Sequence, residues 1–317
     1  MSLEIKKPHV SIWMITYNHE KSIEKAIKSV LMQKTTFEFE LIIGEDCSTD
    51  NTPSIINSYK SKYPNIIRAR FNSANIGMSN NMIKTLEECN GKYIAMLEGD
   101  DYWTDEYKLQ KQVEFLDANT HYSLCCHRYK ILVNDQLEYD DYASPLLLNG
   151  LMSCEFTLEQ NFKHWVTKPL TVMFRKDCLK IGELKQYQYA RDIHLFYNLL
   201  SSKFSGYLMD FFGAVYTKNQ HGVWTSQSTS QQVETSLNVY NDLLSKHKKS
   251  SALQKMYLES LKHYFRHSNN SIFSKRSYHI FASIFKLLPT SKWINAKYYI
   301  LAGVFKNFLL NNHEEST

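Results

Sequence analysis

Two adjacent carboxylates, Asp100 and Asp101, stand in the segment 98–103 (EGDDYW), directly after an apolar run at residues 93–97. The run predicts a buried strand, and carboxylates at the end of such a strand are costly unless their charge is compensated. A hard divalent cation is the usual compensation, because Mg²⁺ takes oxygen ligands from one or two carboxylates and from substrate phosphates. The segment therefore indicates a metal-bridged diphosphate, hence a nucleotide-activated donor. The alternative is an acidic turn that caps a helix starting near Asp105.

Strand-like and helix-like segments alternate over the first hundred residues. The expected strands are residues 10–15, 41–43, 66–71 and 93–97. Apolar residues at helical spacing predict a helix over residues 23–31, with Asn18 as its N-cap. Another helix is expected from about residue 79 to 89, with Gly91 as its C-cap. This alternation indicates an α/β fold, a parallel sheet covered by helices, in which ligands bind beyond the carboxyl ends of the strands.

Polar residues follow each of the four expected strands. The candidate ligands after the first, second and fourth strands are Thr16, Tyr17, Asn18, Glu45, Asp46, Asp100 and Asp101. Each cluster alone could be ordinary turn or capping chemistry. The Asp46 carboxylate could also accept the N3–H of uracil, and the Tyr17 ring could stack on the base. Four clusters at one edge of a sheet favour a nucleotide site over four unrelated turns.

Three of these motifs, in this order, resemble the family 2 glycosyltransferases. The matching segments are VSIWMITYN at residues 10–18, EDCSTDNT at 45–52 and EGDDYW at 98–103, and KLQKQ at 108–112 is similar to a run in bacterial members. The resemblance covers roughly residues 8–225. It implies a GT-A fold with a mostly parallel sheet, a nucleotide-sugar donor, Mn²⁺ or Mg²⁺, and inversion at the anomeric carbon. Glu45 and Glu98 stand where many members have aspartate, and both keep the negative charge.

The resemblance implies a role for each donor-side residue. Tyr17 and Asp46 resemble the pair that binds the base, and Asp100 resembles the carboxylate on the ribose or phosphate side. Asp101 resembles the metal ligand, and it is expected at an exposed strand end. The same nucleotide-sugar site is expected to include Thr16, Asn18 and Glu45.

The second half of the chain is expected to supply the base and the acceptor site. Asp192, in YARDIHLF at residues 189–196, matches the family's general base at the start of a helix. Inversion in one displacement needs a base that takes the acceptor hydroxyl proton, although Asp192 could instead only cap its helix. His221 resembles a loop histidine that binds the metal or a phosphate oxygen, with a loop histidine that has no ligand as the alternative. Trp165 is expected in the core, and residues 125–127 in a buried strand rather than a metal site.

Charge is distributed unevenly along the 317 residues. Residues 246–317 carry 12 Lys and Arg against 3 Asp and Glu, a balance of +9, whereas residues 1–245 carry −4. We expect a GT-A catalytic domain at 1–231, with its nucleotide-sugar half at about 1–104 and its acceptor half at 105–231, and a basic helical extension at 232–317. The extension either packs on the catalytic domain or docks on an anionic membrane through lysines and apolar faces. Nucleic acid is not expected as a partner, and the oligomeric state stays open.

The rest of the composition predicts a cytoplasmic protein, and the basic extension would place it peripherally on the inner face of the membrane. No signal-peptide pattern or bilayer-length apolar run is evident, and the six cysteines lack metal-like spacing. The resemblance implies an inverting transferase that moves one sugar from a nucleotide-diphosphate sugar, such as a UDP-sugar, to a glycan or lipid-linked acceptor of a surface polysaccharide (lipopolysaccharide or capsule). The alternatives are a nucleotidyltransferase of similar fold and a catalytically silent nucleotide-sugar-binding scaffold.

Overall fold

The computed structural model describes residues 7–133, 136–139, 153–200, 204–218 and 227–267, together with 280, 282–283, 286–289 and 292. The chain forms two compact units. The first comprises Met1–Gln186 and Ala190–Lys218, and the second comprises Tyr187–Tyr189 and Asn219–Thr317. The boundary that the sequence analysis placed at residue 231 therefore lies inside the second unit.

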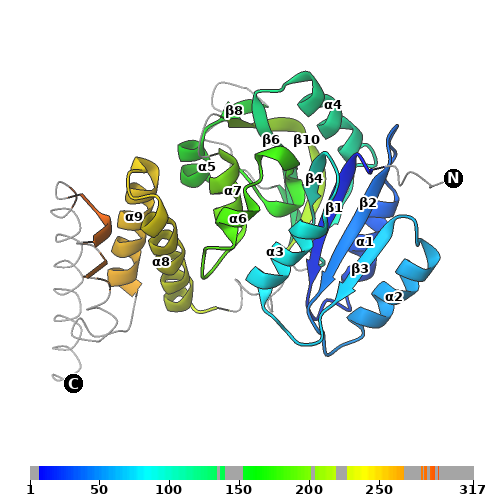
Figure 1. Cartoon of the computed structure of the whole chain (residues 1–317), viewed down its shortest axis with the longest axis horizontal. Helices are drawn as coiled ribbons and strands as arrows, with labels where there is room; N and C mark the ends of the chain where they lie inside the picture. The colour runs from blue at the N-terminus through cyan, green and yellow to red at the C-terminus, as the bar shows by residue number, and fades with distance from the viewer. Residues whose placement is uncertain are drawn as a thin grey trace. The chain divides into compact units, whose positions relative to one another are not determined.

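One sheet organises the first unit, in the order β3-β2-β1-β4-β9-β6-β10-β5, with β7 beside β6 and β8 beside β10. The strands are β1 (Val10–Thr16), β2 (Phe39–Glu45), β3 (Ile67–Phe71), β4 (Tyr93–Met96), β5 (Tyr102–Trp103), β6 (Tyr122–Val133), β7 (Gln136–Tyr139), β8 (Cys154–Phe156), β9 (Met173–Arg175) and β10 (Ser205–Thr217). Strands β3, β2, β1 and β4 lie side by side in parallel (Figure 1). Beyond them β9 runs antiparallel to both β4 and β6, so this half is mixed. The expected α/β fold is confirmed.

Helices cover both faces of this sheet. They are α1 (Ile23–Leu31), α2 (Thr52–Lys62), α3 (Met78–Glu88), α4 (Lys108–Ala118), α5 (Leu158–His164), α6 (Ile181–Leu184) and α7 (Asp192–Leu200), with 3-10 turns η1 (Pro169–Thr171) and η2 (Lys176–Cys178). Successive strand residues face opposite sides. Val10, Ile12 and Met14 of β1 therefore pack with α1, α2 and α4 in one core, whereas Trp13 donates from Nε1 to Met82 O of α3, at 3.1 Å. With both faces covered, the carboxyl edge of the strands is where a ligand can enter.

Two of the expected helix caps were wrong. The residue before α1 is Ser22, and Asn18 lies in the preceding loop with a left-handed φ of 55°. The C-cap of α3 is Cys89. Gly91 instead packs against Ser11 of β1. Gly91 N donates to Ser11 Oγ at 2.7 Å, and a Cβ on Gly91 would stand 2.4 Å from Ser11 N. Only glycine permits this close approach of two backbone segments.

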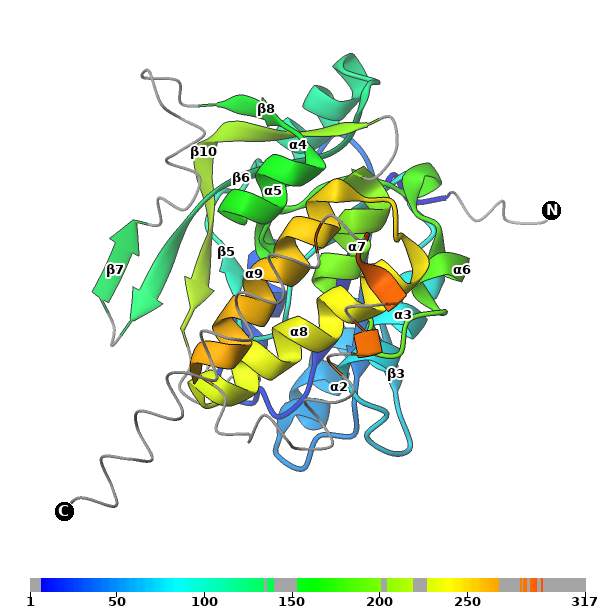
Figure 2. The same ribbon diagram turned by 90° about the vertical axis from the view of Figure 1, so that its left-hand side faces the viewer.

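The second unit contains a pair of helices, α8 (Thr229–Lys246) and α9 (Ser251–His267), which lie side by side (Figure 2). A capping box at Ser228 and Gln231 starts α8. Most apolar residues of the pair are buried: Leu237, Val239, Tyr240, Leu243, Leu244, Leu253, Tyr257, Leu258, Leu261 and Tyr264. The expected extension therefore does form helices, but over 229–267 protein covers apolar faces that were expected to enter a membrane. The rest of the expected helical extension, from residue 268 onward, lies mostly outside the described residues.

Across the part of the chain that the structure describes, each helix is too short or too polar to cross a bilayer.

Candidate active site

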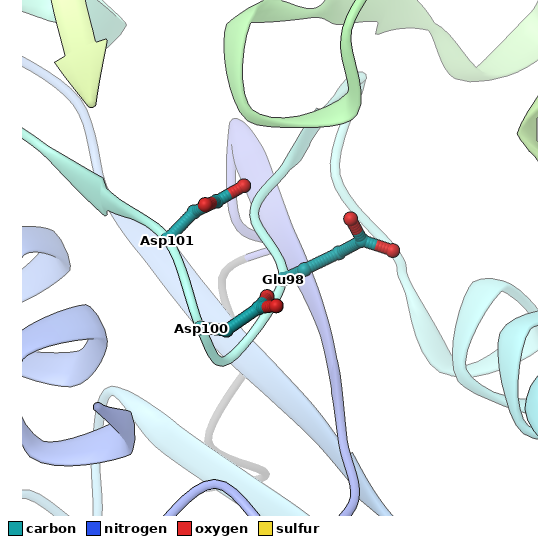
Figure 3. Close-up of side chains that lie close together, drawn as sticks. All are labelled: Glu98, Asp100 and Asp101. Atoms are coloured by element: carbon teal, nitrogen blue, oxygen red, sulfur yellow. The ribbon is translucent and has the colours of Figure 1, made fainter. Parts of the chain in front are cut away.

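Three carboxylates, from Glu98, Asp100 and Asp101, gather on the loop between β4 and β5 (Figure 3). One oxygen of each lies within 4.8 Å of the others. Asp101 is only 2% exposed, and its Oδ1 accepts from Thr217 N of β10 at 2.8 Å. The expectation of an exposed strand end was therefore wrong for Asp101, because the end of β10 covers it. Glu98 joins the cluster although it was not among the predicted site residues.

The acidic loop does not cap the next helix. Helix α4 begins at Lys108, and Asp105 provides the local cap by accepting from Tyr107 N at 2.8 Å. The acidic loop is instead tied to the sheet, since Gly99 N donates to Ile15 O at 3.1 Å. The simple capping alternative is thus excluded for Asp100 and Asp101.

Burial and mutual repulsion disturb the ionisation of this cluster. Loss of hydration, helped by the charges of Asp100 and Asp192, raises the pKa of Glu98 to about 8. Burial and then the charges of Asp100 and Glu98 raise the pKa of Asp101 well above its usual value, against the opposing Thr217 N–H and Lys168 charge. The cluster therefore lacks enough positive charge to keep all its carboxylates ionised. A set of oxygen ligands in this state fits a hard divalent cation.

Asp192 lies at the start of α7, as predicted, and beside the acidic loop. Its charge contributes to the raised pKa of Glu98, which shows that the two carboxylates are close. Its Oδ1 accepts from Ile193 N at 2.9 Å, so it caps the helix. Burial raises its pKa, while the Ile193 N–H and the charges of Lys168 and Arg191 oppose that rise. Capping through Oδ1 leaves Oδ2 able to take a proton, so the capping and catalytic readings are compatible.

Lys168 belongs to this site, although nothing in the sequence pattern singled it out. Its charge favours the ionised forms of both Asp101 and Asp192. Thr171 fixes its backbone by donating from N and Oγ1 to Lys168 O, at 2.9 and 2.8 Å. The Lys168 Nζ lies 5.8 Å from the centre of the Trp165 ring. Trp165 was expected in the core, but it is only half-buried and has a φ of 52°, an unusual conformation for a bulky residue.

The loops after β1 and β2 are tied together beside the acidic loop. Asn18 N donates to Ser48 Oγ at 2.9 Å, and Asn18 Oδ1 accepts from Thr49 N at 2.8 Å. Tyr17 is exposed at 41%, so its ring is available to a ligand. Thr16 is buried against Gly99, and its Oγ1 has no hydrogen-bond partner among the described residues. The structure therefore brings together the three motifs that the sequence separates.

Asp46 is buried behind these loops and is nearly saturated with donors. Its Oδ1 accepts from Asn72 Nδ2 at 2.8 Å and from Ile76 N at 2.9 Å, and its Oδ2 accepts from Gly77 N at 2.9 Å. A carboxylate has about four lone-pair positions. One position, on Oδ2, thus remains for a donor on a ligand.

Glu45 differs from Asp46 because its carboxylate accepts hydrogen bonds from the backbone of its own loop. It is 1% exposed, and its two oxygens accept from Cys47 N at 3.1 Å and Ser48 N at 2.8 Å. These bonds stabilise the turn in which Cys47 has a left-handed φ of 60°. Glu45 therefore shapes the loop after β2, rather than facing a ligand as the sequence motif alone suggests.

Of the remaining predicted residues, the structure describes 125–127 but not His221. Cys125, Cys126 and His127 are buried in β6, in keeping with the expected strand. His221 lies outside the described residues, as does most of its segment 218–225.

Comparison with known proteins gives a consistent family. The profile of Glycosyl transferase family 2 matches residues 11–181. An uncharacterised protein of Mycobacterium bovis is 31% identical over 227 residues, 70% of this chain and 62% of the relative, so this chain spans less than two thirds of that relative. A putative teichuronic acid biosynthesis glycosyltransferase of Bacillus subtilis is 30% identical over 206 residues, 64% of this chain and 77% of the relative. S. aureus TarS 1–349 in complex with UDP-GlcNAc superposes with a TM-score of 0.61 at 20% identity, over 93% of this chain and 81% of that chain, which shows a common fold.

We expect Mn²⁺ to stabilise the protein more at about pH 9 than at about pH 6. In the metal-free protein Glu98 has a pKa of about 8 against an ordinary 4.5, so its contribution to stability is complete below pH 4.5 and is lost as the pH rises through 8. Mn²⁺ competes with the bound protons for the carboxylates and therefore binds better as they ionise. Thermal unfolding with and without Mn²⁺ measures this. Glu98→Gln is the comparison variant and should reduce the pH dependence, leaving the part that is due to Asp101; a Mn²⁺ effect equal at both pH values in the parent protein would contradict the assignment.

Proposed function

Because this chain belongs to glycosyl transferase family 2, we propose that it transfers one sugar from a nucleotide-sugar donor to a glycan or lipid-linked acceptor of a cell-surface polysaccharide. One observation carries the proposal: carboxylate oxygens of Glu98, Asp100 and Asp101 lie within 4.8 Å of one another beyond the carboxyl end of β4, and Asp192, from a distant part of the sequence, adds its charge to theirs. That edge is where open α/β sheets bind their ligands. The relative named as a putative teichuronic acid biosynthesis glycosyltransferase supports the surface-polysaccharide role.

The donor side is proposed to hold a nucleoside diphosphate through a divalent cation. Glu98, Asp100 and Asp101 would hold Mn²⁺ or Mg²⁺, and the ion would neutralise the charge of the departing diphosphate. Lys168, beside Asp101, offers a further positive charge to the same phosphates. His221, if it reaches the site, would add a ligand there.

Uracil is the base that the donor site suits best. Asp46 keeps one acceptor position, on Oδ2, and uracil presents one N–H, at N3. Guanine presents two adjacent N–H donors, which would need both carboxylate oxygens. The exposed Tyr17 ring provides a stacking surface for the base. We therefore propose a UDP-sugar, and the likeness to a UDP-GlcNAc complex agrees with this choice.

The chemical step is proposed to be a single displacement with inversion. The acceptor hydroxyl oxygen attacks the anomeric carbon as the bond from that carbon to the diphosphate oxygen breaks. Asp192 takes the hydroxyl proton, and the nucleoside diphosphate leaves with the bonding electrons. Lys168 and Arg191 favour the ionised, proton-accepting form of Asp192.

Two other functions remain as outcomes of the test. A silent nucleotide-sugar-binding scaffold would bind the donor without turning it over. A nucleotidyltransferase would release pyrophosphate from a nucleoside triphosphate instead of a diphosphate from a nucleotide sugar. Neither of these two functions accounts for a carboxylate base beside the acidic loop, whereas attack on the anomeric carbon needs one.

We expect Asp192→Asn to lower turnover by about 10²–10⁴-fold without weakening donor binding, because asparagine keeps the shape but cannot take the proton. The assay is release of UDP from UDP-N-acetylglucosamine and from UDP-glucose, with water as acceptor, alongside donor affinity by calorimetry. Asp177→Asn, on the exposed side of η2, is the matched control and should behave like the parent protein. Normal turnover at saturating donor in Asp192→Asn would remove this residue from the catalytic role.

We also propose that the basic segment 246–317 holds the protein at an anionic membrane, where a lipid-linked acceptor lies. The apolar faces of α8 and α9 are covered, so exposed lysines at the turn between them, Lys246, Lys248 and Lys249, carry the attraction. Each contributes about 1 kcal/mol near an anionic surface, and salt screens it.

Reversing the charge of Lys248 and Lys249 to glutamate should reduce co-sedimentation with phosphatidylglycerol vesicles. Lys62→Glu with Lys163→Glu, two exposed lysines of the first unit, is the control pair and should leave it unchanged. Equal sedimentation of the parent protein with neutral and anionic vesicles would remove the membrane from its partners.

A further inference from the structure

Three residues just before the proposed base belong to the other half of the molecule. Residues Tyr187–Tyr189 group with the C-terminal helical unit, although Gln186 before them and Ala190 after them belong to the sheet unit. We name residues 187–189 the clamp segment. The covalent chain leads from it directly to Asp192, so whatever holds the clamp segment also restrains the start of α7.

Helix α8 and its C-cap residue bind the clamp segment through Tyr187 and Tyr189, among other contacts. Tyr187 Oη and His247 Nε2 are 2.7 Å apart, and Tyr187 is only 8% exposed. Tyr189 N donates to Asp242 Oδ2 at 3.3 Å. Asp242 lies on α8, and His247 is its C-cap. A side chain at one position and a main-chain N–H two positions later thus bind the same helix.

The chain between the clamp segment and Asp192 has little freedom. Ala190 is fully buried. Arg191 N donates to His194 Nδ1 at 3.1 Å, and His194 N donates back to Arg191 O at 3.0 Å. The covalent chain and these two hydrogen bonds therefore connect the backbone of Tyr189 to the first turn of α7.

We propose that α8 acts through the clamp segment to position Asp192, so that the C-terminal helical unit controls proton transfer and leaves donor binding alone. This inference rests on the proposed function, since it assigns the base to Asp192. Tyr187, Asp242 and His247 are positioning residues in this account. The donor-side loops at 16–18, 45–52 and 98–101 are tied to the sheet and to one another, which is why donor affinity is independent of the clamp.

The test compares Tyr187→Phe and Asp242→Ala with Tyr189→Phe in the full chain. Tyr187→Phe removes the hydroxyl that meets His247, whereas Tyr189→Phe removes one whose partner is Gln188 Nε2, at 3.0 Å, and leaves the backbone bond to Asp242 intact. The measured quantities are kcat and KM for UDP release from the nucleotide sugar that binds best in the presence of Mn²⁺. We expect kcat to fall roughly 3- to 30-fold in the first two variants with KM unchanged, because small displacements of a catalytic group are costly. Tyr189→Phe should match the parent protein.

Hydrogen exchange gives a readout that needs no turnover. The amides of Arg191 and His194 should exchange faster in Tyr187→Phe and Asp242→Ala than in Tyr189→Phe. If the parent protein turns over no nucleotide sugar, the proposed function fails. Hydrogen exchange alone then tests whether the clamp segment restrains the start of α7. Equal exchange in all three variants, unchanged kcat in an active enzyme, or a parallel loss of kcat and donor affinity would each overturn the proposal.

Discussion

Repulsion among clustered carboxylates is the constraint on which the rest of this structure depends. Glu98, Asp100 and Asp101 have oxygens within 4.8 Å of one another, and Asp192 adds its charge to the same region. Two such charges about 4 Å apart repel by about 4 kcal/mol at an effective dielectric constant near 20. The Thr217 N–H and the charge of Lys168 compensate only part of this repulsion, at Asp101. Bound protons relieve the remaining repulsion in the free protein. In our proposal, a divalent cation bound to a diphosphate replaces them.

The surrounding structure keeps these groups from moving apart. The acidic loop is tied to β1, and the loop after β1 is tied to the loop after β2. Behind them Glu88 binds Arg70 at 2.8 Å, Arg70 binds Asn72, and Asn72 binds Asp46. The site is therefore built before a ligand arrives. Such preorganisation is what lets charged groups stabilise a developing charge without first reorienting.

The sequence predicted those features that local patterns determine. Apolar runs located the parallel strands, and polar clusters at their ends located the loops of the candidate site, because strand ends in a parallel sheet share one edge. The sequence did not predict features that depend on contacts between residues far apart in the chain. Asp101 is covered by β10, more than one hundred residues further along, and Lys168 joins the site through the packing of a segment with no motif. The backbone approach of Gly91 to Ser11 and the burial of the apolar faces of α8 and α9 likewise depend on tertiary partners that no local pattern names.

The central claim is that the acidic loop binds a divalent cation that also contacts the diphosphate of the donor. Electron paramagnetic resonance of Mn²⁺ with the protein and UDP tests it most directly, since the bound ion reports its own neighbours. The account predicts protein-bound Mn²⁺ with hyperfine coupling to phosphorus, and loss of that signal in Asp101→Asn, which keeps an oxygen to accept from Thr217 N. A spectrum of free aqueous Mn²⁺, or bound Mn²⁺ without coupling to phosphorus, would contradict it.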